Sequence, residues 1–555
     1  MKRALSLLLI AVMVMGLCSV AVAEGFEKPT ANPTLPADWA PFAENVTITV
    51  PVYDRSKAGY PAVDDNYWTK WIQSEFGDKW NITVKYVPIP RGDVMTKYNM
   101  LIAAKDSPTI MMEYDYPKVS QWATDGAMQT IDLEAFKAVA PTFYQAMVDN
   151  NQLGYTDING ETYFVLTERA YYNTTYTFVT MCRMDWLRKV GYDHVPQSYE
   201  EYSDAMDKII AAGLTDIAPL GLGIPTAAYI QNFSFRDVNP DEAEWAMHSS
   251  LGTPGFAWEP THKMLKRRNA EYHKGWYSTE FDLSMSSAGA ATDQEQTDFV
   301  NGKIFSYGGY MSSNVAWLNA FYENNPDAEL AIVSSYQGVE PGVVDVPQFR
   351  SDNPFGAIVG FSSLATPDQL KAAWMLMEWM IQPEVLYVLE NGIEGVTYTL
   401  DADGLPVVDG AYMGEGMLNH NMNIDMTMLV HAVRKVGTIE QTIAGITPKG
   451  IPQDFYQPMV NNYYELKEIA DQGNSYSDPV FACSIESESE YTAPLLSLWQ
   501  IDFAKLVKCD PAEFDALYDQ LAQEFLDAGY QEIIDERLAA YEAGQCTKLP
   551  NGKAK

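Results

Sequence analysis

The residues best suited to chemistry are aromatic and charged side chains that follow predicted strands. Three short groups stand out: residues 53–55 (Tyr-Asp-Arg), 113–116 (Glu-Tyr-Asp-Tyr) and 307–310 (Tyr-Gly-Gly-Tyr). A pyranose offers an apolar C–H face that stacks on an aromatic ring and a rim of hydroxyls that hydrogen-bond to carboxylates, amides and arginine. Because α/β sheets place ligands at the carboxyl ends of their strands, these groups predict a saccharide site. Core packing is the alternative for any single aromatic residue.

Signatures of enzymes and metal sites are missing from the sequence. The chain has no GxSxG, HExxH or GxxxxGK[ST] motif, and none of its six histidines has a metal-ligating residue at position i+4. Two acidic turns, 157–161 and 401–404, fall short of a complete calcium loop, and turn formation explains their Asn-Gly and Asp-Gly pairs. We therefore expect no cofactor, no metal and no enzymatic activity. The 74 acidic residues nevertheless leave a secreted glycan-active enzyme as an open alternative.

The first part of the chain alternates between strand and helix patterns. β-Branched and apolar residues predict strands at 45–53, 81–88 and 109–112. Apolar residues at helical spacing predict helices at 65–76 and 92–104. Alternation at this spacing is typical of βαβ units with a parallel sheet.

The rest of the chain indicates a second lobe and a helical end. Further strands are expected at 162–166, 176–183, 299–306, 329–334 and 356–364, and helices at 185–190, 198–212, 366–381 and 514–541. Ser198 with Glu201, and Thr366 before Pro367, are typical helix starts. The expected fold class is α/β, with two lobes, crossing hinge segments and a ligand in the crevice between them.

The domain boundaries follow from this pattern. Lobe 1 is expected to take residues 45–165 and parts of 365–430. Lobe 2 is expected to take residues 184–364 and parts of 431–555. The hinge is expected near 166–184 and in the return segments.

The N-terminus has the pattern of a secretory signal peptide over residues 1–23. Lys2 and Arg3 precede an apolar run, and Ala21-Val22-Ala23 offers small residues for cleavage before Glu24. The run is too short for a membrane span of about 20 residues. Cys18 raises the alternative of lipid attachment, which the large residue Leu17 disfavours. Residues 24–44 are interpreted as an N-terminal tether, and the mature protein is expected outside the cytoplasm.

The net charge and the cysteine content indicate which kinds of partner and bond are expected. The formal net charge of −37 disfavours nucleic acid as a partner, because a chain this acidic repels phosphates. Four cysteines follow the signal peptide, with no metal-binding spacing. A Cys483–Cys509 disulfide and buried free thiols are both compatible with export.

Three segments in order resemble extracellular solute-binding proteins of bacterial ABC importers. They are RMDWLRKVG at 183–191 with Pro196 and 200–202 (Glu-Glu-Tyr), FVNGK at 299–303, and NGIEGVTY at 391–398. The chain resembles the carbohydrate-type, family 1 group, and is similar to its long oligosaccharide-binding lipoproteins. Many of those relatives carry an acidic calcium loop after the helix that holds Glu201, and residues 212–219 lack it.

The resemblance implies two lobes that close on a carbohydrate and deliver it to ABC permease subunits, with the protein as a monomer. Capture of a non-sugar solute such as a peptide is the other alternative. Arg183 and Trp186 match family positions, where packing and ion pairing are as reasonable as ligand contact. The expected ligand-binding residues are Tyr53, Asp54, Arg55, Tyr114, Asp115, Tyr307, Tyr310, Trp317 and Glu394.

Overall fold

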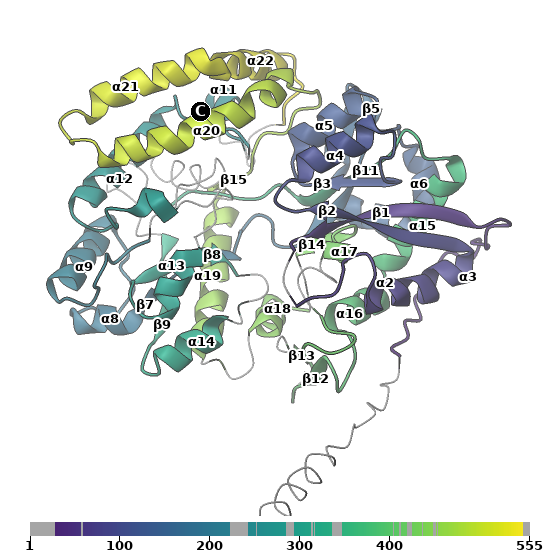
Figure 1. The fold of residues 1–555 in the computed structure, drawn as a ribbon, viewed down its shortest axis with the longest axis horizontal. Coiled ribbons are helices and arrows are strands. Elements are labelled where there is room, and N and C mark those ends of the chain that lie inside the picture. Colours follow the sequence, from purple (N-terminus) through teal and green to yellow (C-terminus); the bar gives the residue numbers. More distant parts are fainter. Residues whose placement is uncertain are drawn as a thin grey trace, which may run out of the picture.

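The computed structural model has two lobes that lie side by side (Figure 1). It describes residues 28–547 except 57–58, 222–241, 251, 285–292, 312–314, 316, 336–346, 403, 410–411, 419–424, 434, 436, 448–450 and 452. The predicted signal peptide, with Cys18, and residues 24–27 of the predicted tether lie outside the described residues. Among the helices of the described part, none is both long and apolar enough to cross a membrane.

The sheet of lobe 1 holds the strands predicted near the N-terminus. Strand β1 (Val46–Asp54) runs parallel to β2 (Ile82–Pro90). Thr49 and Thr109 exchange hydrogen bonds between backbone N–H and side-chain oxygen at 2.8 and 3.1 Å, which join β1 to the start of β3 (Ile110–Glu113). A four-stranded ladder then follows in the order β14–β6–β11–β3, with the remaining bounds β14 (His431–Val433), β6 (Val165–Arg169) and β11 (Phe355–Phe361).

Strand β11 corrects the predicted domain boundary. The sequence prediction placed 356–364 in lobe 2, but β11 pairs antiparallel with both β3 and β6 of lobe 1. All seven residues of β11 are buried, as a central strand requires. A continuous apolar run shows that a strand is central without showing which sheet contains it. The same pairing makes the lobe 1 sheet mixed rather than wholly parallel.

Helices cover both faces of this sheet. Their bounds are α2 (Tyr67–Ile72) with a π segment (Gln73–Gly77), α3 (Asp78–Trp80), α4 (Val94–Ala103), α5 (Tyr116–Thr124), α6 (Leu133–Val139), α7 (Pro141–Asp149), α15 (Pro367–Met380), α16 (Pro383–Asn391) and α17 (Asp425–Thr427). Thr366 and Gln369 form a capping box at the start of α15, which confirms the predicted helix start. Two hairpins, β4 (Asp157–Ile158) with β5 (Glu161–Thr162) and β12 (Tyr398–Leu400) with β13 (Pro406–Val408), complete the lobe.

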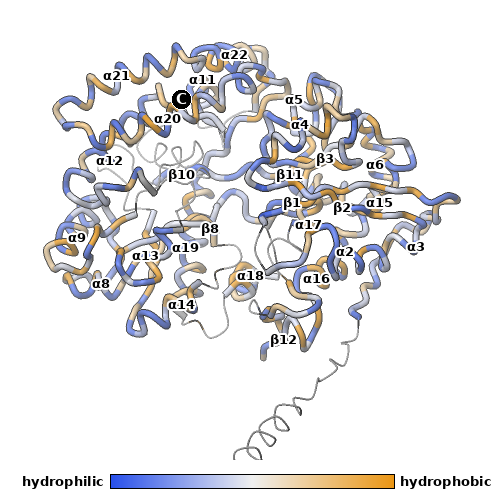
Figure 2. Tube along the Cα trace, viewed as in Figure 1, coloured by the Kyte–Doolittle hydropathy of each residue, from blue (hydrophilic) through white to orange (hydrophobic). Residues whose placement is uncertain are grey.

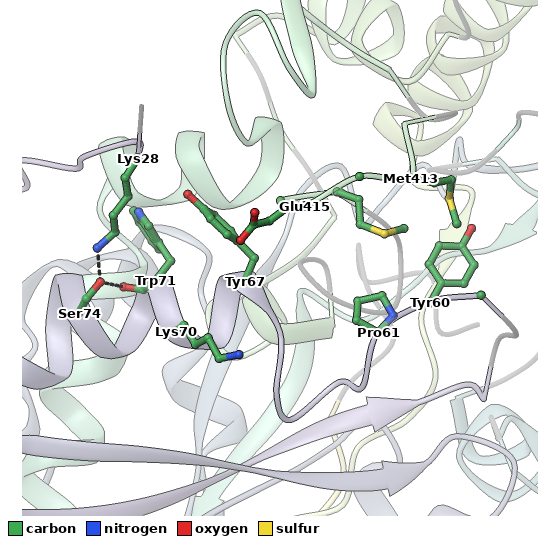
Figure 3. Close-up of a pocket in the computed structure, with 13 residues that line it drawn as sticks. Lys28, Tyr60, Pro61, Tyr67, Lys70, Trp71, Ser74, Met413 and Glu415 are labelled. Carbon is green, nitrogen blue, oxygen red and sulfur yellow. Dashed lines mark hydrogen bonds between the residues drawn. The ribbon is translucent and has the colours of Figure 1, made fainter. Parts of the chain in front are cut away.

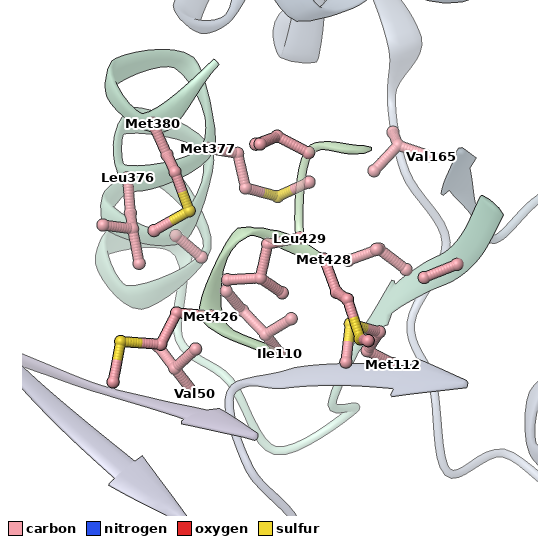
Figure 4. Close-up of a cluster of buried hydrophobic side chains, with 14 of the residues drawn as sticks. Val50, Ile110, Met112, Val165, Leu376, Met377, Met380, Met426, Met428 and Leu429 are labelled. Atoms are coloured by element: carbon pink, nitrogen blue, oxygen red, sulfur yellow. The ribbon is translucent and has the colours of Figure 1, made fainter. Parts of the chain in front are cut away.

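Methionines fill much of the lobe 1 core. Met377 and Met380 of α15 lie against β1 and β3, and Met426 and Met428 enter the same cluster beside them (Figure 4). Flexible thioether side chains suit the irregular space between a helix and a twisted sheet. The burial of Met426 and Met428 fixes the short segment that carries Asp425.

Lobe 2 contains a three-stranded antiparallel sheet in the order β8–β7–β9. The strands are β8 (Ser306–Tyr310), β7 (Phe178–Arg183) and β9 (Leu330–Ile332). Its helices are α8 (Met184–Lys189), α9 (Tyr199–Ala211), α11 (Glu242–His248), α12 (Glu259–His273), α13 (Asp293–Val300), α14 (Trp317–Asn324), α18 (Ile439–Ile446) and α19 (Gln453–Asp471).

The strand predicted at 299–306 is wrong. Phe299 and Val300 end helix α13, and the chain then turns through Gly302 at φ +70° before β8 begins at Ser306. Phe299, Ile304 and Phe305 of the predicted range are apolar and buried, so the pattern did not separate a helix end from a strand.

Three C-terminal helices lie along lobe 2, at the top in Figure 1. They are α20 (Glu486–Lys508), α21 (Phe514–Phe525) and α22 (Gln531–Glu542), with α21 and α22 joined by a π segment (Leu526–Tyr530). Gly529 has φ +115° there, which bends the continuous helix predicted over 514–541. Apolar and polar residues alternate along α20 and α21 (Figure 2), as helices with one covered face require.

Two features join the lobes. Residues 170–177 run from β6 to β7, and two non-glycine residues there, Tyr171 and Thr175, have positive φ of 57° and 45°. Strands β10 (Phe349–Arg350) and β15 (Ser475–Tyr476) pair in parallel. Arg350 of β10 forms a two-point ion pair with Asp478, which is buried.

Candidate functional site

Several strands of lobe 1 end at one edge of its sheet. β1 and β2 are parallel, while β3 and β6 are both antiparallel to β11 and so run in one direction. Thr49 and Tyr53 lie beside Thr109 and Glu113 respectively, four residues along in each strand, so β1 and β3 also run together. The side chains at these strand ends therefore gather in one place.

Tyr53 forms the base of this edge. Its side chain is 1% exposed, and its hydroxyl donates a hydrogen bond of 2.7 Å to Oε2 of Glu113. The guanidinium of Arg91 lies 4.6 Å above the Tyr53 ring and 3.9 Å from Oε1 of Glu113. Burial, followed by the charge of Glu113, raises the pKa of Tyr53, so its hydroxyl stays protonated and holds the carboxylate. The Arg91 side chain is 39% exposed, which leaves its outer face accessible.

Tyr114 is the next ring along the edge and is half-buried. It stacks on Tyr53 with 6.4 Å between ring centroids and an interplanar angle of 25°. Burial raises the pKa of Tyr114, and Tyr310 of lobe 2 is close enough to add to that shift. Tyr310 lies at the end of β8, is 37% exposed, and packs against Phe178 at 4.8 Å. The two predicted tyrosines thus approach one another across the boundary between the lobes.

Ion pairs hold the other arginines of the edge. Arg55 donates to both carboxylate oxygens of Asp425, at 2.8 and 3.1 Å, and Asp425 is fully buried. Arg169, at the end of β6, lies 2.9 Å from Asp352. Each arginine is partly exposed, so it can be fixed by its carboxylate and still offer N–H groups to a ligand.

Two predicted carboxylates have local structural roles. Asp54 accepts the backbone N–H of Ser56 at 2.7 Å. Asp115 caps the N-terminus of α5 by accepting the N–H of Lys118 at 3.3 Å. Burial raises the pKa of Asp115 to about 6.

The predicted residues of lobe 2 do not all share one environment. Tyr307 stacks on Phe299 at 5.8 Å and meets the edge of Trp317 at 5.3 Å, and its hydroxyl accepts from Gln296 at 3.1 Å. These rings pack against the core of lobe 2, while Tyr310 is the more exposed residue.

Glu394 lies apart, exposed beside the β12–β13 hairpin. Its charge contributes to the raised pKa of Tyr398 on that hairpin.

Arg183 and Trp186, the matched family positions, have packing roles in this structure. Arg183 is buried and donates to both oxygens of Asp185 at 2.8 Å. Its guanidinium lies 5.2 Å from the Trp186 ring.

Arg91, Arg169, Asp352 and Asp425 were missed by the sequence prediction. Arg91 follows β2 and Arg169 ends β6, and both lie a few residues beyond the strands predicted at 81–88 and 162–166, so the strand-end rule would have found them only with the observed strand bounds. Asp425 and Asp352 carry no local signal, because only the folded chain brings them to the edge. Within the described residues, no three His, Cys, Asp or Glu side chains gather as metal ligands.

A pocket of about 900 Å³ opens on lobe 1 between the segment that follows β1 and the one that follows β13. Tyr60, Pro61 and Met413 line one part of it, and Tyr67 and Glu415 lie further along (Figure 3). The same two segments carry Arg55 and Asp425, so this ion pair links the pocket walls to the strand-end edge.

Comparison with solved structures shows the same fold at low identity. An HMO-binding, ABC-transporter-associated solute-binding protein from Bifidobacterium longum infantis ATCC 15697 is 13% identical, with a TM-score of 0.58 over 90% of this chain and 99% of that one. The alginate-binding protein AlgQ2 is 12% identical, with a TM-score of 0.58 over 91% and 99%. An extracellular solute-binding protein from Bifidobacterium longum subsp. infantis is 16% identical, with a TM-score of 0.57 over 92% and 100%.

Comparison of sequences gives the family. No curated protein matches the chain significantly. The family model described as bacterial extracellular solute-binding protein matches residues 61–386, which is more than half of the chain. That match covers the ends of β2, β3 and β6, the crossing segment and the sheet of lobe 2, and it begins after the end of β1. The chain belongs to the bacterial extracellular solute-binding proteins, and its two-lobed α/β fold is that of a periplasmic binding protein.

Proposed function

We propose that this protein captures an oligosaccharide between its two lobes and delivers it to the permease of an ABC importer. The observation that carries the proposal is the strand-end edge of lobe 1, where Arg91 is partly exposed, Tyr114 is half-buried and Tyr310 of lobe 2 lies close enough to raise the pKa of Tyr114. Tyrosine rings supply faces for sugar C–H groups, and the paired arginines and carboxylates supply donors and acceptors for hydroxyls. The saccharides named in the neighbours' titles are consistent with this chemistry.

The charges favour a neutral saccharide over an acidic one. Arg55, Arg91 and Arg169 each have a carboxylate within ion-pair distance, so none of these three arginines offers an unneutralised positive charge to a ligand. The whole chain carries −37, which disfavours the approach of a polyanion. Hydroxyl groups can use the remaining hydrogen-bonding capacity of these pairs without an added charge.

A binding panel tests the proposal. Calorimetry and thermal shift with neutral oligosaccharides, uronate oligosaccharides and peptides are expected to show saturable binding to a neutral oligosaccharide. Chromatography of the same mixtures tests the enzyme alternative, and unchanged saccharide is the expected result. Binding to peptides alone, or release of shorter saccharides, would overturn the proposal.

The proposal also covers the export of the protein and its oligomeric state. The signal peptide is cleaved after Ala23 without lipid at Cys18, and the protein acts as a monomer beside its permease. N-terminal sequencing and intact mass of the exported protein test the first part, with Glu24 expected as the first residue. A lipid-modified Cys18 as the first residue would contradict it. Light scattering tests the monomeric state, and a stable dimer would contradict it.

A further inference from the structure

The last described residues of the chain, 545–547, pair with the segment that precedes α20. Phe481 and Cys546 form an antiparallel bridge. Two backbone hydrogen bonds flank it, from the N–H of Ala482 to Gln545 at 2.8 Å and from the N–H of Thr547 to Val480 at 3.0 Å. The bridge therefore fixes the register of the C-terminal segment against residues 480–482.

This register brings two cysteines to one small cluster of side chains. Cys546 lies opposite Phe481 in the bridge, and Cys483 follows Phe481 by two residues. Both cysteines pack against one small cluster formed by Phe481, Ile485 and Ala540. The chain bends at 482–483, which turns Cys483 out of the straight strand path.

The other cysteines of the described chain lie elsewhere. Cys509 ends α20 in the lobe 2 core, where its Sγ donates to the carbonyl of Leu506 at 3.2 Å. Cys182 is buried within β7. The four cysteines of the described residues are free thiols in this structure, and the geometry favours a partner for Cys483 other than Cys509, the partner named in the sequence analysis.

We propose that Cys483 and Cys546 form a disulfide bond in the exported protein. The two thiols lose two protons and two electrons as the S–S bond forms. The electrons pass to the disulfide of an extracytoplasmic thiol oxidant, which is reduced to two thiols by exchange. The family is extracellular, and disulfides persist in such oxidising surroundings.

Such a bond would act on the C-terminal helices. Residues 483 and 546 enclose α20, α21 and α22, so the bond would close these helices into one loop. Closing a long loop restricts the unfolded chain and stabilises the folded one. Burial raises the pKa of the Cys546 thiol to about 12, with Cys483 among the groups that add to the shift. Because the thiolate is the attacking species, the bond is expected to form before this segment is fully buried.

Mass spectrometry of the full chain tests the pairing directly. The protein is exported or refolded with oxidised glutathione, alkylated with iodoacetamide without reduction, and digested. A peptide pair joined through Cys483 and Cys546, lost on reduction, is the expected result. Alkylation of both thiols, or a bond from either one to Cys509, would overturn the proposal.

Thermal unfolding provides a second measurement. Dithiothreitol is expected to lower the Tm of the wild type by several degrees and to leave the Tm of Cys483→Ser and Cys546→Ser unchanged. Cys509→Ser is the matched control and should respond to dithiothreitol as the wild type does. A wild-type Tm that does not respond to dithiothreitol would count against the bond, even if a serine variant fails to fold.

Discussion

At the scale of single residues, adjacent tyrosines of similar sequence context have different environments. Tyr53 is buried and holds Glu113 through its hydroxyl, whereas the neighbouring ring of Tyr114 is partly open and lies near Tyr310. Strand-end position selected both residues. Only their burial separates the residue that supports the edge from the one that can meet a ligand.

Substitution of Tyr114 by Ala should weaken saccharide binding while leaving the fold intact. Loss of one stacking face is expected to reduce affinity about tenfold or more, since each tenfold corresponds to about 1.4 kcal/mol. Calorimetry with the saccharide identified in the panel measures the affinity. Tyr464→Ala removes an exposed tyrosine of α19 and serves as the control. Equal affinity in both variants would remove Tyr114 from the site.

Substitution of Tyr53 by Ala should instead lower the free energy of unfolding. A large aromatic side chain is lost from the core and Glu113 loses its hydroxyl donor, so a cost of about 3–5 kcal/mol is expected. Urea unfolding measures it. A Tyr53→Ala protein as stable as the wild type would show that this ring does not support the edge.

At the scale of elements, the segment 170–177 determines how the two lobes are connected. It contains two tight turns, in which Thr174 bonds back to the carbonyl of Tyr171 and Phe178 bonds back to that of Thr175. Positive φ at Tyr171 and Thr175 costs free energy in the folded state. Strained residues of this kind persist only where the surrounding structure holds them in place.

Substitution of Thr175 by Gly is therefore expected to leave stability unchanged or raise it by about 1 kcal/mol. Glycine adopts φ +45° without a Cβ clash, which offsets its greater freedom in the unfolded chain. Thr180→Gly, in the extended strand β7, is the matched control and should cost about 1 kcal/mol. Chemical unfolding of the two variants gives the comparison. A larger loss at Thr175 than at Thr180 would show that the turn needs the threonine side chain.

At the scale of the whole molecule, buried polar groups attach the C-terminal helices to lobe 2. Arg537 of α22 donates to Glu488 of α20 at 2.6 Å and to carbonyls at the end of α11, including Ser249 at 2.9 Å. His248 stacks on Trp258 at 5.6 Å and lies 2.9 Å from the Tyr530 hydroxyl. These contacts join segments that are far apart in the sequence.

Substitution of Arg537 by Met should be among the most destabilising changes in this region. It leaves the buried Glu488 carboxylate without its cation, and breaking such a pair costs about 3–5 kcal/mol. The double variant Arg537→Met with Glu488→Met should recover part of that loss, because it removes the unpaired charge but not the unmet carbonyls. Urea unfolding of both variants measures the difference. No recovery in the double variant would assign the cost to the carbonyls alone.

A fall in pH should weaken the attachment of the C-terminal helices to lobe 2, because His248 becomes protonated. Burial, followed by the charge of Arg537, lowers the pKa of His248 to about 4, below the ordinary value near 6.5. The unfolded state then binds the proton first, so this stabilisation is complete above about pH 6.5 and is lost as the pH falls toward 4. Asp115 acts in the opposite direction, because its pKa is raised to about 6.

Unfolding free energies at several pH values between 7 and 4 measure this effect. His248→Gln is expected to reduce the loss of stability across that interval. An unchanged pH profile in the variant would show that His248 does not contribute.

The sequence by itself determined the local elements and the family. Alternating and helical patterns located β1, β2, β3, α4 and α15 to within a few residues, because those patterns follow from backbone geometry and one buried face. Three short motifs indicated the family that the comparison shows. Strand-end position also selected Tyr114 and Tyr310, which the structure brings together.

Only the tertiary structure decided the contacts between distant segments. It assigned β11 to lobe 1, joined Arg55 to Asp425 and set Cys483 beside Cys546 rather than Cys509. Each of these pairings depends on which surfaces meet after the elements have formed. Residue type and spacing limit what a side chain can do, while burial and neighbours from elsewhere in the chain determine what it does.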